Sequence, residues 1–244
     1  MKMEQGIRLN RYLAMCGAGA RRKVESLIAE GRVRVDGKVV LMPGYRVDDT
    51  IRVTVDGIPV APEEKKYIVI NKPSGWVCSV SDAFDPIIVD LLPETCRQYR
   101  LFPVGRLDRE SEGLLILTND GEFAQEILHP SKNILREYHV LLDREISRRE
   151  IRLWMAGTEL DGHFLKPLNV RVLEKEPGNR WVSVVIGEGI KREVRRMAQS
   201  IGFQVLMLVR KRIGKMELEN LPKGEFIEFS RSELWGAIRS GRKI

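Results

Sequence analysis

Residues 105–113 read GRLDRESEG and run directly into the apolar residues 114–118, LLILT. The apolar run is short enough for a buried strand, and a glycine at each end of the preceding segment is typical of a loop. Within that loop, Asp108 stands between Arg106 and Arg109. A carboxylate held by a rigid strand and flanked by positive charge stays ionised and oriented, which suits a nucleophile or a general base. A surface ion pair beside a strand is the alternative that this spacing alone leaves open.

The composition indicates an ordinary globular chain with no membrane segment. Its 244 residues provide material for one large domain or two smaller ones, at 43% hydrophobic and 31% charged content. No stretch approaches the roughly 18 uncharged apolar residues of a membrane helix, and the first residues lack a secretory signal. Cys16, Cys78 and Cys96 form no CxxC pair, so the sequence predicts neither a zinc site nor a disulfide framework. We therefore expect a cytoplasmic protein with reduced thiols, no metal and no membrane partner.

Positive charge is concentrated in two stretches of the chain. Residues 1–60 hold eleven Lys or Arg against seven Asp or Glu, and residues 188–215 hold eight against Glu188 and Glu193. Together these excesses outweigh the net charge of +7, so the remainder is slightly acidic. Two separated basic patches predict two surfaces that face one nucleic acid, with a solvated charged surface as the alternative.

The first sixty residues are predicted to form a compact unit. Helical spacing of apolar residues predicts a short helix that ends at Gly17-Ala18-Gly19 and a second helix over residues 21–30. Cations in the first turn of the second helix oppose the helix dipole unless an anion neutralises them. Residues 33–40 read as two strands about an Asp-Gly turn, and residues 51–55 as a further strand.

This region resembles the alpha-L RNA-binding motif, which occurs in a ribosomal small-subunit protein and in several RNA-modifying enzymes. The match rests on Arg8-Leu9, on Ala20-Arg21-Arg22 and on residues 31–38, GRVRVDGK. Ala20 replaces the usual serine, so a hydroxyl cap is lost while the basic residues are kept. The resemblance implies binding of structured RNA through phosphates and shape.

The rest of the chain is predicted to be a second, larger domain of the α+β class. We divide the chain into an alpha-L domain (1–60), a linker (61–66) and a catalytic domain (67–244), whose mixed sheet is mostly antiparallel with flanking helices. The expected strands are residues 67–70, 114–118, 138–142, 181–186, 205–211 and 226–229. The expected helices are residues 121–128, 147–155 and 192–201. Asn119-Asp120-Gly121 is interpreted as a structural turn with positive φ.

Several other kinds of catalytic site are disfavoured by their motifs. Gly187-Glu188-Gly189 lacks the third glycine of a dinucleotide site, and no Gly-Lys-Ser/Thr sequence ends a phosphate loop. The three histidines show neither metalloprotease spacing nor a nucleophile elbow. We expect no metal and no nucleotide cofactor.

Five motifs in order carry the resemblance of the whole chain. They are Lys72-Pro73-Ser74-Gly75, the segment 105–121, residues 136–140 (REYHV), residues 186–197 (IGEGIKREVRRM) and residues 206–214 (LMLVRKRIG). In this order, behind the RNA-binding module, they resemble the rRNA pseudouridine synthases of the RsuA branch. The resemblance implies that the protein isomerises uridine to pseudouridine without cofactor, acting as a monomer on ribosomal RNA or an assembling subunit.

The resemblance also implies roles for particular residues. Asp108 matches the essential aspartate, as nucleophile at the ribose or the uracil or as the base of a glycal route. Arg195 matches the basic residue that pairs with it, and Tyr138 the tyrosine that stacks on uracil or manages the C5 proton. Leu208 corresponds to an apolar wall under the base, although plain core packing is an alternative.

Access to the reacting atoms requires a flipped-out uridine, because C1′ and C5 are shielded within an RNA helix. Arg106 matches a position whose guanidinium can fill the vacated stack, with an ion pair to Glu110 or Asp120 as the alternative. The residues expected to bind RNA are Arg8, Arg21, Arg22, Lys23, Arg32, Arg34, Lys38, Lys72, Arg192 and Arg196.

Two other functions are alternatives to an rRNA pseudouridine synthase. A non-catalytic RNA-binding ribosome-assembly factor on the same fold would be expected to lose at least one of Asp108, Tyr138 and Arg195. A DNA-binding protein is disfavoured because neither basic stretch shows a helix-turn-helix followed by dimer-forming heptads.

Overall fold

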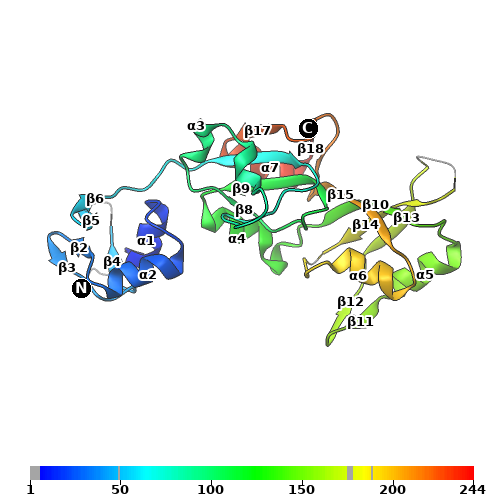
Figure 1. Ribbon diagram of the computed structural model, residues 1–244, viewed down its shortest axis with the longest axis horizontal. Helices are drawn as coiled ribbons and strands as arrows, with labels where there is room; N and C mark the ends of the chain where they lie inside the picture. The colour runs from blue at the N-terminus through cyan, green and yellow to red at the C-terminus, as the bar shows by residue number, and fades with distance from the viewer. Residues whose placement is uncertain (1–5, 49, 175–177, 188) are drawn as a thin grey trace. The chain divides into compact units, whose positions relative to one another are not determined.

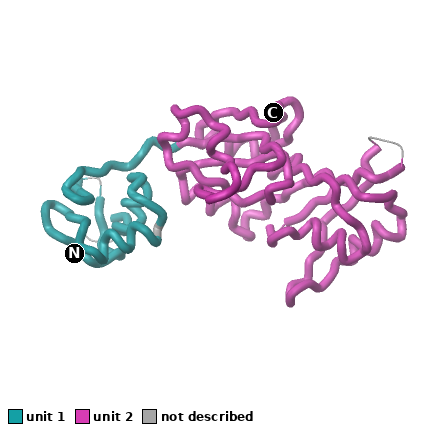
Figure 2. Tube along the Cα trace, viewed as in Figure 1, with its two compact units in different colours: residues 1–65 teal, residues 66–244 magenta. Residues whose placement is uncertain are grey.

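The chain forms two compact units, residues 1–65 and 66–244 (Figure 2). The computed structural model describes residues 6–48, 50–174, 178–187 and 189–244, apart from the side chain of Arg21. Each unit has its own apolar core, so each is described by itself. In the described part of the chain, no helix has the length and apolar character needed to cross a membrane.

Unit 1 combines two helices with short antiparallel strands (Figure 1). Its elements are β1 (Ile7–Arg8), α1 (Leu9–Met15), α2 (Arg21–Ala29), β2 (Val33–Val35), β3 (Lys38–Val39), β4 (Arg46–Val47), β5 (Val53–Val55) and β6 (Ile58–Pro59). The strands form a sheet of order β3-β2-β5-β6 and a separate β1-β4 pair. Leu9, Leu13, Val24 and Ile28 are fully buried at helical spacing and pack with Val33 into the core. The two predicted helices and the hairpin are confirmed.

The hairpin and the start of α2 have the predicted local chemistry. Asp36 and Gly37 both have positive φ, of 47° and 78°, which suits the tight turn between β2 and β3. Ala20 is the N-cap of α2 and makes no side-chain cap, and the first turn contains no acidic residue. The amide groups of this turn are therefore left without a side-chain acceptor at their N-cap.

Unit 2 is built on one large sheet. Its strands are β7 (Tyr67–Lys72), β8 (Phe102–Pro103), β9 (Glu112–Thr118), β10 (Arg136–Leu142), β13 (Asn169–Val172), β14 (Trp181–Ile186), β15 (Val205–Ile213), β16 (Met216–Glu217), β17 (Phe226–Phe229) and β18 (Arg242–Lys243), with β11 (Thr158–Leu160) and β12 (His163–Leu165) as a separate hairpin. Its helices are η1 (Ile88–Leu91), α3 (Glu94–Arg97), α4 (Gly121–Leu128), η2 (Pro130–Lys132), α5 (Arg148–Ala156), α6 (Glu193–Ser200) and α7 (Arg231–Ser240).

The sheet is mixed and mostly antiparallel, as predicted. Its main path runs β13-β14-β10-β15-β9-β7-β17. Among the named strand pairs of the described chain, β15–β9 and β16–β18 are parallel and the others antiparallel. Every residue of β7 and β9 is buried, because apolar clusters cover both faces of these central strands.

The parallel contact between β9 and β15 is short and very close. It comprises two register pairs, Val209 with Glu112 and Arg210 with Gly113. A Cβ at Gly113 would stand 2.3 Å from the Arg210 carbonyl oxygen, and Gly113 has a φ of 102°. Glycine therefore fits this junction on both steric and conformational grounds. The junction brings the loop before β9 alongside β15 and its neighbour β10.

Two local predictions differ from the structure. Asn119-Asp120-Gly121 is a helix start instead of a turn with positive φ, since Asp120 has a φ of −92° and caps α4 by accepting from Glu122 and Phe123. Its carboxylate also accepts from the Tyr67 hydroxyl at 2.8 Å. The sequence interpretation missed α7, although Ser230 and Glu233 form the capping box that signals its start.

Candidate active site

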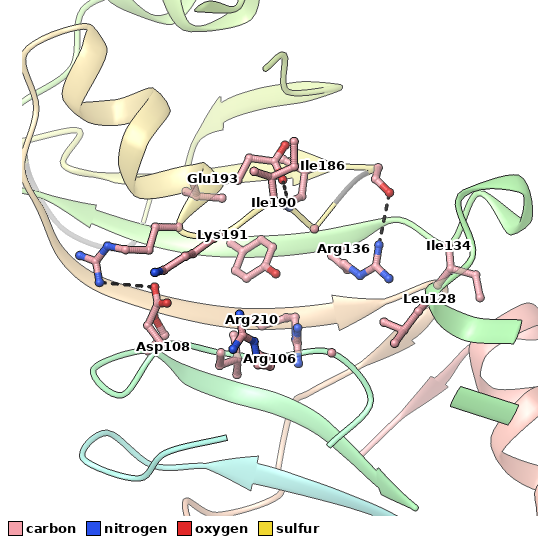
Figure 3. Close-up of a pocket in the computed structure, with 18 of the residues that line it drawn as sticks. Arg106, Asp108, Leu128, Ile134, Arg136, Ile186, Ile190, Lys191, Glu193 and Arg210 are labelled. Atoms are coloured by element: carbon pink, nitrogen blue, oxygen red, sulfur yellow. Dashed lines mark hydrogen bonds and ion pairs between the residues drawn. The ribbon is translucent and has the colours of Figure 1, made fainter. Parts of the chain in front are cut away.

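A pocket of about 710 Å³ opens in unit 2 beside the β9–β15 junction (Figure 3). Its walls come from the loop before β9, the end of α4, strands β10 and β15, and the segment between β14 and α6. The lining residues with polar or charged side chains are Arg106, Asp108, Ser111, His129, Arg136, Tyr138, Lys191, Arg192, Glu193 and Arg210. Cations outnumber carboxylates here, so the pocket favours a ligand that carries or develops negative charge.

Two buried side chains, Lys72 and Cys78, hold the backbone of the loop that carries Asp108. The Lys72 side chain is fully buried, and its Nζ donates to the carbonyl oxygens of Pro73, Arg109 and Ser111 at 3.0, 3.1 and 2.6 Å. The Cys78 Sγ accepts from the backbone N–H of Leu107 at 3.4 Å. These contacts hold the backbone on both sides of Asp108.

The assignment of Lys72 to RNA binding is therefore wrong. A fully buried ammonium that donates to three carbonyl oxygens has no surface left for a phosphate. Burial lowers the pKa of this ammonium, as expected for a charge removed from water. Lys72 positions the loop of Asp108 instead.

Replacing Lys72 by methionine is expected to lower the free energy of unfolding by about 2–4 kcal/mol, because three carbonyl oxygens lose their donor. Catalytic rate should fall about tenfold as the loop loosens, while RNA affinity is retained. Urea unfolding, filter binding and rate measurements check these outcomes. Lys166→Met at an exposed position is the control and should change stability by less than about 0.5 kcal/mol. Lost RNA affinity with unchanged stability would restore the RNA-binding assignment.

Asp108 lies between two arginines of unequal burial. Its Oδ2 is 3.9 Å from Arg195 Nε and 3.8 Å from Arg192 Nη1. The Arg195 side chain is 13% exposed and that of Arg192 46%. Arg195 is anchored by bonds from Nη1 to the Val205 carbonyl oxygen at 2.8 Å and from Nη2 to Ser111 Oγ at 3.5 Å.

The Arg195 Nε is buried and has no hydrogen-bond partner in the described chain. Because its distance from Asp108 exceeds a hydrogen bond by about 1 Å, a small shift of the carboxylate would form one. Burial lowers the pKa of Arg195 and Arg192 lowers it further, while Asp108 acts in the opposite direction. The structure thus brings together the aspartate and the arginine that the sequence pairs.

Arg192 has a strained backbone at the rim of the pocket. It is the N-cap of α6 with a φ of 55°, a left-handed conformation that is uncommon for residues with a side chain. This conformation places its guanidinium near both Asp108 and Glu110, each at 3.8 Å. Such strain at a pocket rim is typical of a functional position.

Tyr138 and Leu208 lie on one face of the sheet, at the floor of the pocket. Tyr138 on β10 pairs in register with Arg210 on β15, and Val140 pairs with Leu208. Tyr138 and Leu208 are 7% and 6% exposed and belong to the same apolar cluster. Both therefore line the pocket and contribute to the core. Core packing of Leu208 is observed, and its role beneath a base stays a prediction.

Arg106 and Arg109, on either side of Asp108, make different contacts. Arg106 is exposed and lines the pocket. The carboxylates of Glu110 and Asp120 interact with Arg192 and Arg231 respectively, which disfavours the alternative of an Arg106 ion pair. Arg109 pairs with Asp85 at 3.0 Å and bonds the Gly75 carbonyl oxygen, so it ties the loop to the segment after β7.

The other cations predicted to bind RNA differ in their availability. Arg8, Arg22, Lys23, Arg34 and Lys38 are exposed on unit 1, and the side chain of Arg21 lies outside the described residues. Two further arginines are paired. Arg32 binds Asp56 through two hydrogen bonds, and Arg196 donates to Asp161 at 2.6 Å. Each of these two arginines thus has a carboxylate partner within its own unit, and its contact with RNA stays a prediction.

Sequence reasoning missed two arginines of the pocket. Arg136 and Arg210 are 9% and 3% exposed and line the pocket. The signal was available, since each stands two residues from an assigned residue, Tyr138 or Leu208, on the same strand. Alternation along a strand places such neighbours on the same face. In Figure 3, Arg136 lies at the end of the pocket opposite Asp108, with Arg210 between them.

This arrangement suits chemistry at an anionic or electron-rich ligand. A carboxylate close to two arginines can act as nucleophile or base, a tyrosine and a leucine offer apolar contact for a planar ring, and further cations surround them. Within the described residues, no group of three His, Cys, Asp or Glu side chains is placed to hold a metal ion.

Comparison with family models gives two matches along the chain. Residues 66–200 match the model described as RNA pseudouridylate synthase, and residues 7–50 match the S4 domain. The first match spans most of unit 2, including Asp108, Tyr138 and Arg195.

Individual relatives extend over nearly the whole chain. A protein of Aquifex aeolicus named an uncharacterized RNA pseudouridine synthase is 38% identical over 93% of this chain and 92% of its own length. The Bacillus subtilis protein YtzG, named likewise, is 36% identical over 93% of this chain and 97% of its own. SVR1 of Arabidopsis thaliana, named a putative chloroplastic ribosomal large subunit pseudouridine synthase, is 35% identical over 95% of this chain and 60% of its own. A crystal structure titled pseudouridylate synthase aligns with a TM-score of 0.67 at 27% identity, covering 94% of this chain and 98% of that one.

Proposed function

Because the chain belongs to the RNA pseudouridylate synthase family, we propose that it converts a specific uridine of ribosomal RNA to pseudouridine, with Asp108 as the reacting carboxylate. The observation that carries the proposal is the placement of Asp108 beside the buried Arg195, in a pocket lined by Tyr138 and Leu208. The ribosomal substrate is supported by the RNA-binding domain and by the name of the Arabidopsis relative.

The proposed reaction changes bonds at both the ribose and the base of the uridine. The N-glycosidic bond breaks, the base rotates, and C5 bonds to C1′ while its proton leaves. Asp108 acts as nucleophile at the ribose or the uracil, or as the base of a glycal route, and Arg195 orients it. Tyr138 stacks on the uracil or manages the C5 proton, and Leu208 excludes water beneath the base. The reaction is an isomerisation, so its atoms balance without a cofactor.

Delivery of the uridine requires base flipping, for which Arg106 is suitably placed. It is exposed at the pocket and carries a planar guanidinium that can stack where the base was. Arg192 at the rim then contacts the RNA backbone. An assembly factor without catalysis would have no use for the Asp108–Arg195 pair beside this pocket.

Unit 1 is proposed to bind a neighbouring RNA helix. Its exposed cations and the uncapped start of α2 offer both charge and amide donors to phosphates. We keep the division into an RNA-binding domain (1–60), a linker (61–66) and a catalytic domain (67–244) as part of the proposal. One chain supplies Asp108, Tyr138 and Arg195, so we propose that a monomer acts, in the compartment where ribosomal subunits assemble.

Tritium release from RNA labelled at uridine C5 tests this function, because the C5 hydrogen is lost when C5 bonds to C1′. Transcripts of small- and large-subunit rRNA, and subunit particles from a strain that lacks the gene, are the substrates. Release from one of them, with the new pseudouridine mapped by carbodiimide and primer extension, is the expected result. No release from any of them would reject the proposal.

A further inference from the structure

Arg210 holds a buried hydrogen-bond donor with no acceptor in the described chain. Its Nε donates to the Leu114 carbonyl oxygen at 2.7 Å, whereas its Nη2 is buried and has no hydrogen-bond partner. The residue is 3% exposed and lines the pocket. Buried polar groups are nearly always paired, because an unpaired one costs the free energy of its lost hydration. This orphaned donor therefore points to an acceptor that enters with a ligand.

A second buried guanidinium lies close to the first. Arg136 donates from Nη1 to the Gly187 carbonyl oxygen and from Nη2 to that of Ile127. Burial lowers the pKa of Arg136 and Tyr138 offsets part of this effect, while Arg210 lowers the pKa further and Glu193 raises it. In the described part of the chain, the hydrogen bonds of both guanidinium groups end on backbone carbonyl oxygens. Two like charges thus lie close together at low exposure. This arrangement lowers the free energy of unfolding, and such arrangements are typical of functional sites.

Both arginines adjoin the surfaces proposed to hold the uracil. Arg210 is the register partner of Tyr138, and it stands two residues after Leu208 on β15. Arg136 stands two residues before Tyr138 on β10. Residues two apart on a strand, and residues paired across strands, share a face of the sheet. A base that contacts Tyr138 and Leu208 is therefore within reach of Arg210.

Two of the three proposed routes create a negative charge on the free base at this place. In the ribose-attack route Asp108 bonds to C1′, and in the glycal route it removes a C2′ proton. In both routes the bonding pair of C1′–N1 stays on N1 and spreads to the O2 and O4 carbonyl oxygens. The base carries this charge until C5 bonds to C1′ and the C5 proton is lost to solvent. A donor fixed beside those oxygens stabilises the cleaved state more than the intact uridine.

A backbone phosphate is a less suitable ligand for Arg210. Phosphates remain in the RNA strand at the protein surface, where Arg106, Lys191 and Arg192 are exposed around the pocket. These cations can offset the phosphate charge without help from a side chain that is nearly inaccessible. The base is the part of the nucleotide that reaches the pocket floor.

We propose that Arg210 donates through Nη2 to a carbonyl oxygen of the flipped-out uracil and stabilises the negative charge that the base carries after C1′–N1 cleavage, with Arg136 adding positive potential. This inference rests on the proposed function, whose active RNA substrate provides the assay.

The variants Arg210→Gln and Arg210→Lys test the role of the charge. Gln keeps a neutral donor, so single-turnover tritium release should fall about a hundredfold, while Lys should recover part of the rate. RNA affinity and its salt dependence should stay within about twofold of wild type, because no phosphate contact is removed. Arg212→Gln is the matched control on the same strand. A register shift between Glu137 and Tyr138 interrupts the alternation after Arg210, so Arg212 pairs with Glu137 on the other face of the sheet. Its rate should equal that of wild type.

A substrate whose base is a better leaving group distinguishes a catalytic role of Arg210 from a structural one. Fluorine at C5 stabilises the uracil anion, so transcripts that contain 5-fluorouridine should depend less on Arg210. Loss of the N-linked 5-fluorouridine in nuclease digests, followed by mass spectrometry, measures that rate. The ratio of wild-type to Arg210→Gln rates should be smaller than with uridine.

Three outcomes would overturn the inference. An unchanged rate in Arg210→Gln would exclude a catalytic role, and a loss of affinity with a salt slope smaller by about one would indicate a phosphate contact. An equal rate loss for uridine and 5-fluorouridine, with lowered thermal stability in both variants, would indicate a structural role. Wild-type protein that is inactive on every substrate would reject the proposed function itself.

Discussion

Asp108→Asn is expected to reduce tritium release from the RNA substrate by more than about ten thousand-fold. The amide has nearly the shape of the carboxylate but is neither a nucleophile toward C1′ nor a base toward C2′. The pocket and its surrounding cations remain, so RNA affinity should stay within about threefold of wild type, as filter binding would measure. The expected size of the effect follows from the proposed role of Asp108 as the group that makes or breaks the first covalent bond.

Glu110→Gln is the matched control for that substitution. Glu110 lies two residues further along the same loop, is more exposed than Asp108, and stands at the same distance from Arg192. The two substitutions therefore remove the same charge from the same neighbourhood. Glu110→Gln should keep the rate within about twofold, as expected for an exposed carboxylate. Tritium release by Asp108→Asn at the wild-type rate would refute the catalytic assignment.

Arg195→Met is expected to lower the single-turnover rate about a thousandfold, with Arg192→Met as its comparison. Both guanidinium groups lie just under 4 Å from Asp108, but Arg195 is far more buried. Water and salt screen the exposed Arg192 strongly and the buried Arg195 weakly. Arg195 is also fixed by the Val205 carbonyl oxygen and by Ser111, so its orientation is predetermined.

The two arginine variants should therefore fail in different ways. Arg192→Met should retain its rate within about fivefold and lose affinity, with a salt slope smaller by about one, because its proposed contact is a phosphate. Arg195→Met should retain affinity and lose rate. Rates measured at saturating protein and affinities measured at several salt concentrations separate the two effects. Equal rate losses in both variants would contradict the assigned difference.

Much of the fold was predictable because its signals are local. The apolar runs of β7 and β9 and the helical spacing of α4 are determined by neighbours in sequence, and the Asp-Gly turn of unit 1 has its own backbone preference. The flanking arginines and the following strand singled out Asp108 but left a surface ion pair open as an alternative. Its catalytic assignment came from the order of the five motifs along the chain.

The parts that escaped prediction depend on distant contacts. Lys72 resembles a surface cation in sequence, but two of the three carbonyl oxygens that it binds lie 37 and 39 residues away. Arg136 and Arg210 belong to one site because β10 and β15 pair in a particular register, which no local pattern specifies. By contrast, α7 and the cap at Asp120 had local signals, a capping box and a side-chain acceptor, that were misread or overlooked.

The close approach at Gly113 has a consequence for how the protein tolerates change. Two pairs of residues join the half of the sheet that carries the Asp108 loop to the half that carries Tyr138 and Leu208. Any side chain at position 113 would push these halves apart and open the pocket along its length. In a survey of all substitutions, a residue with no functional group should therefore be among the least replaceable in the domain. Its intolerance would reflect the space available at the β9–β15 junction, which sets how far the Asp108 loop lies from Tyr138 and Leu208, rather than any chemistry of the glycine itself.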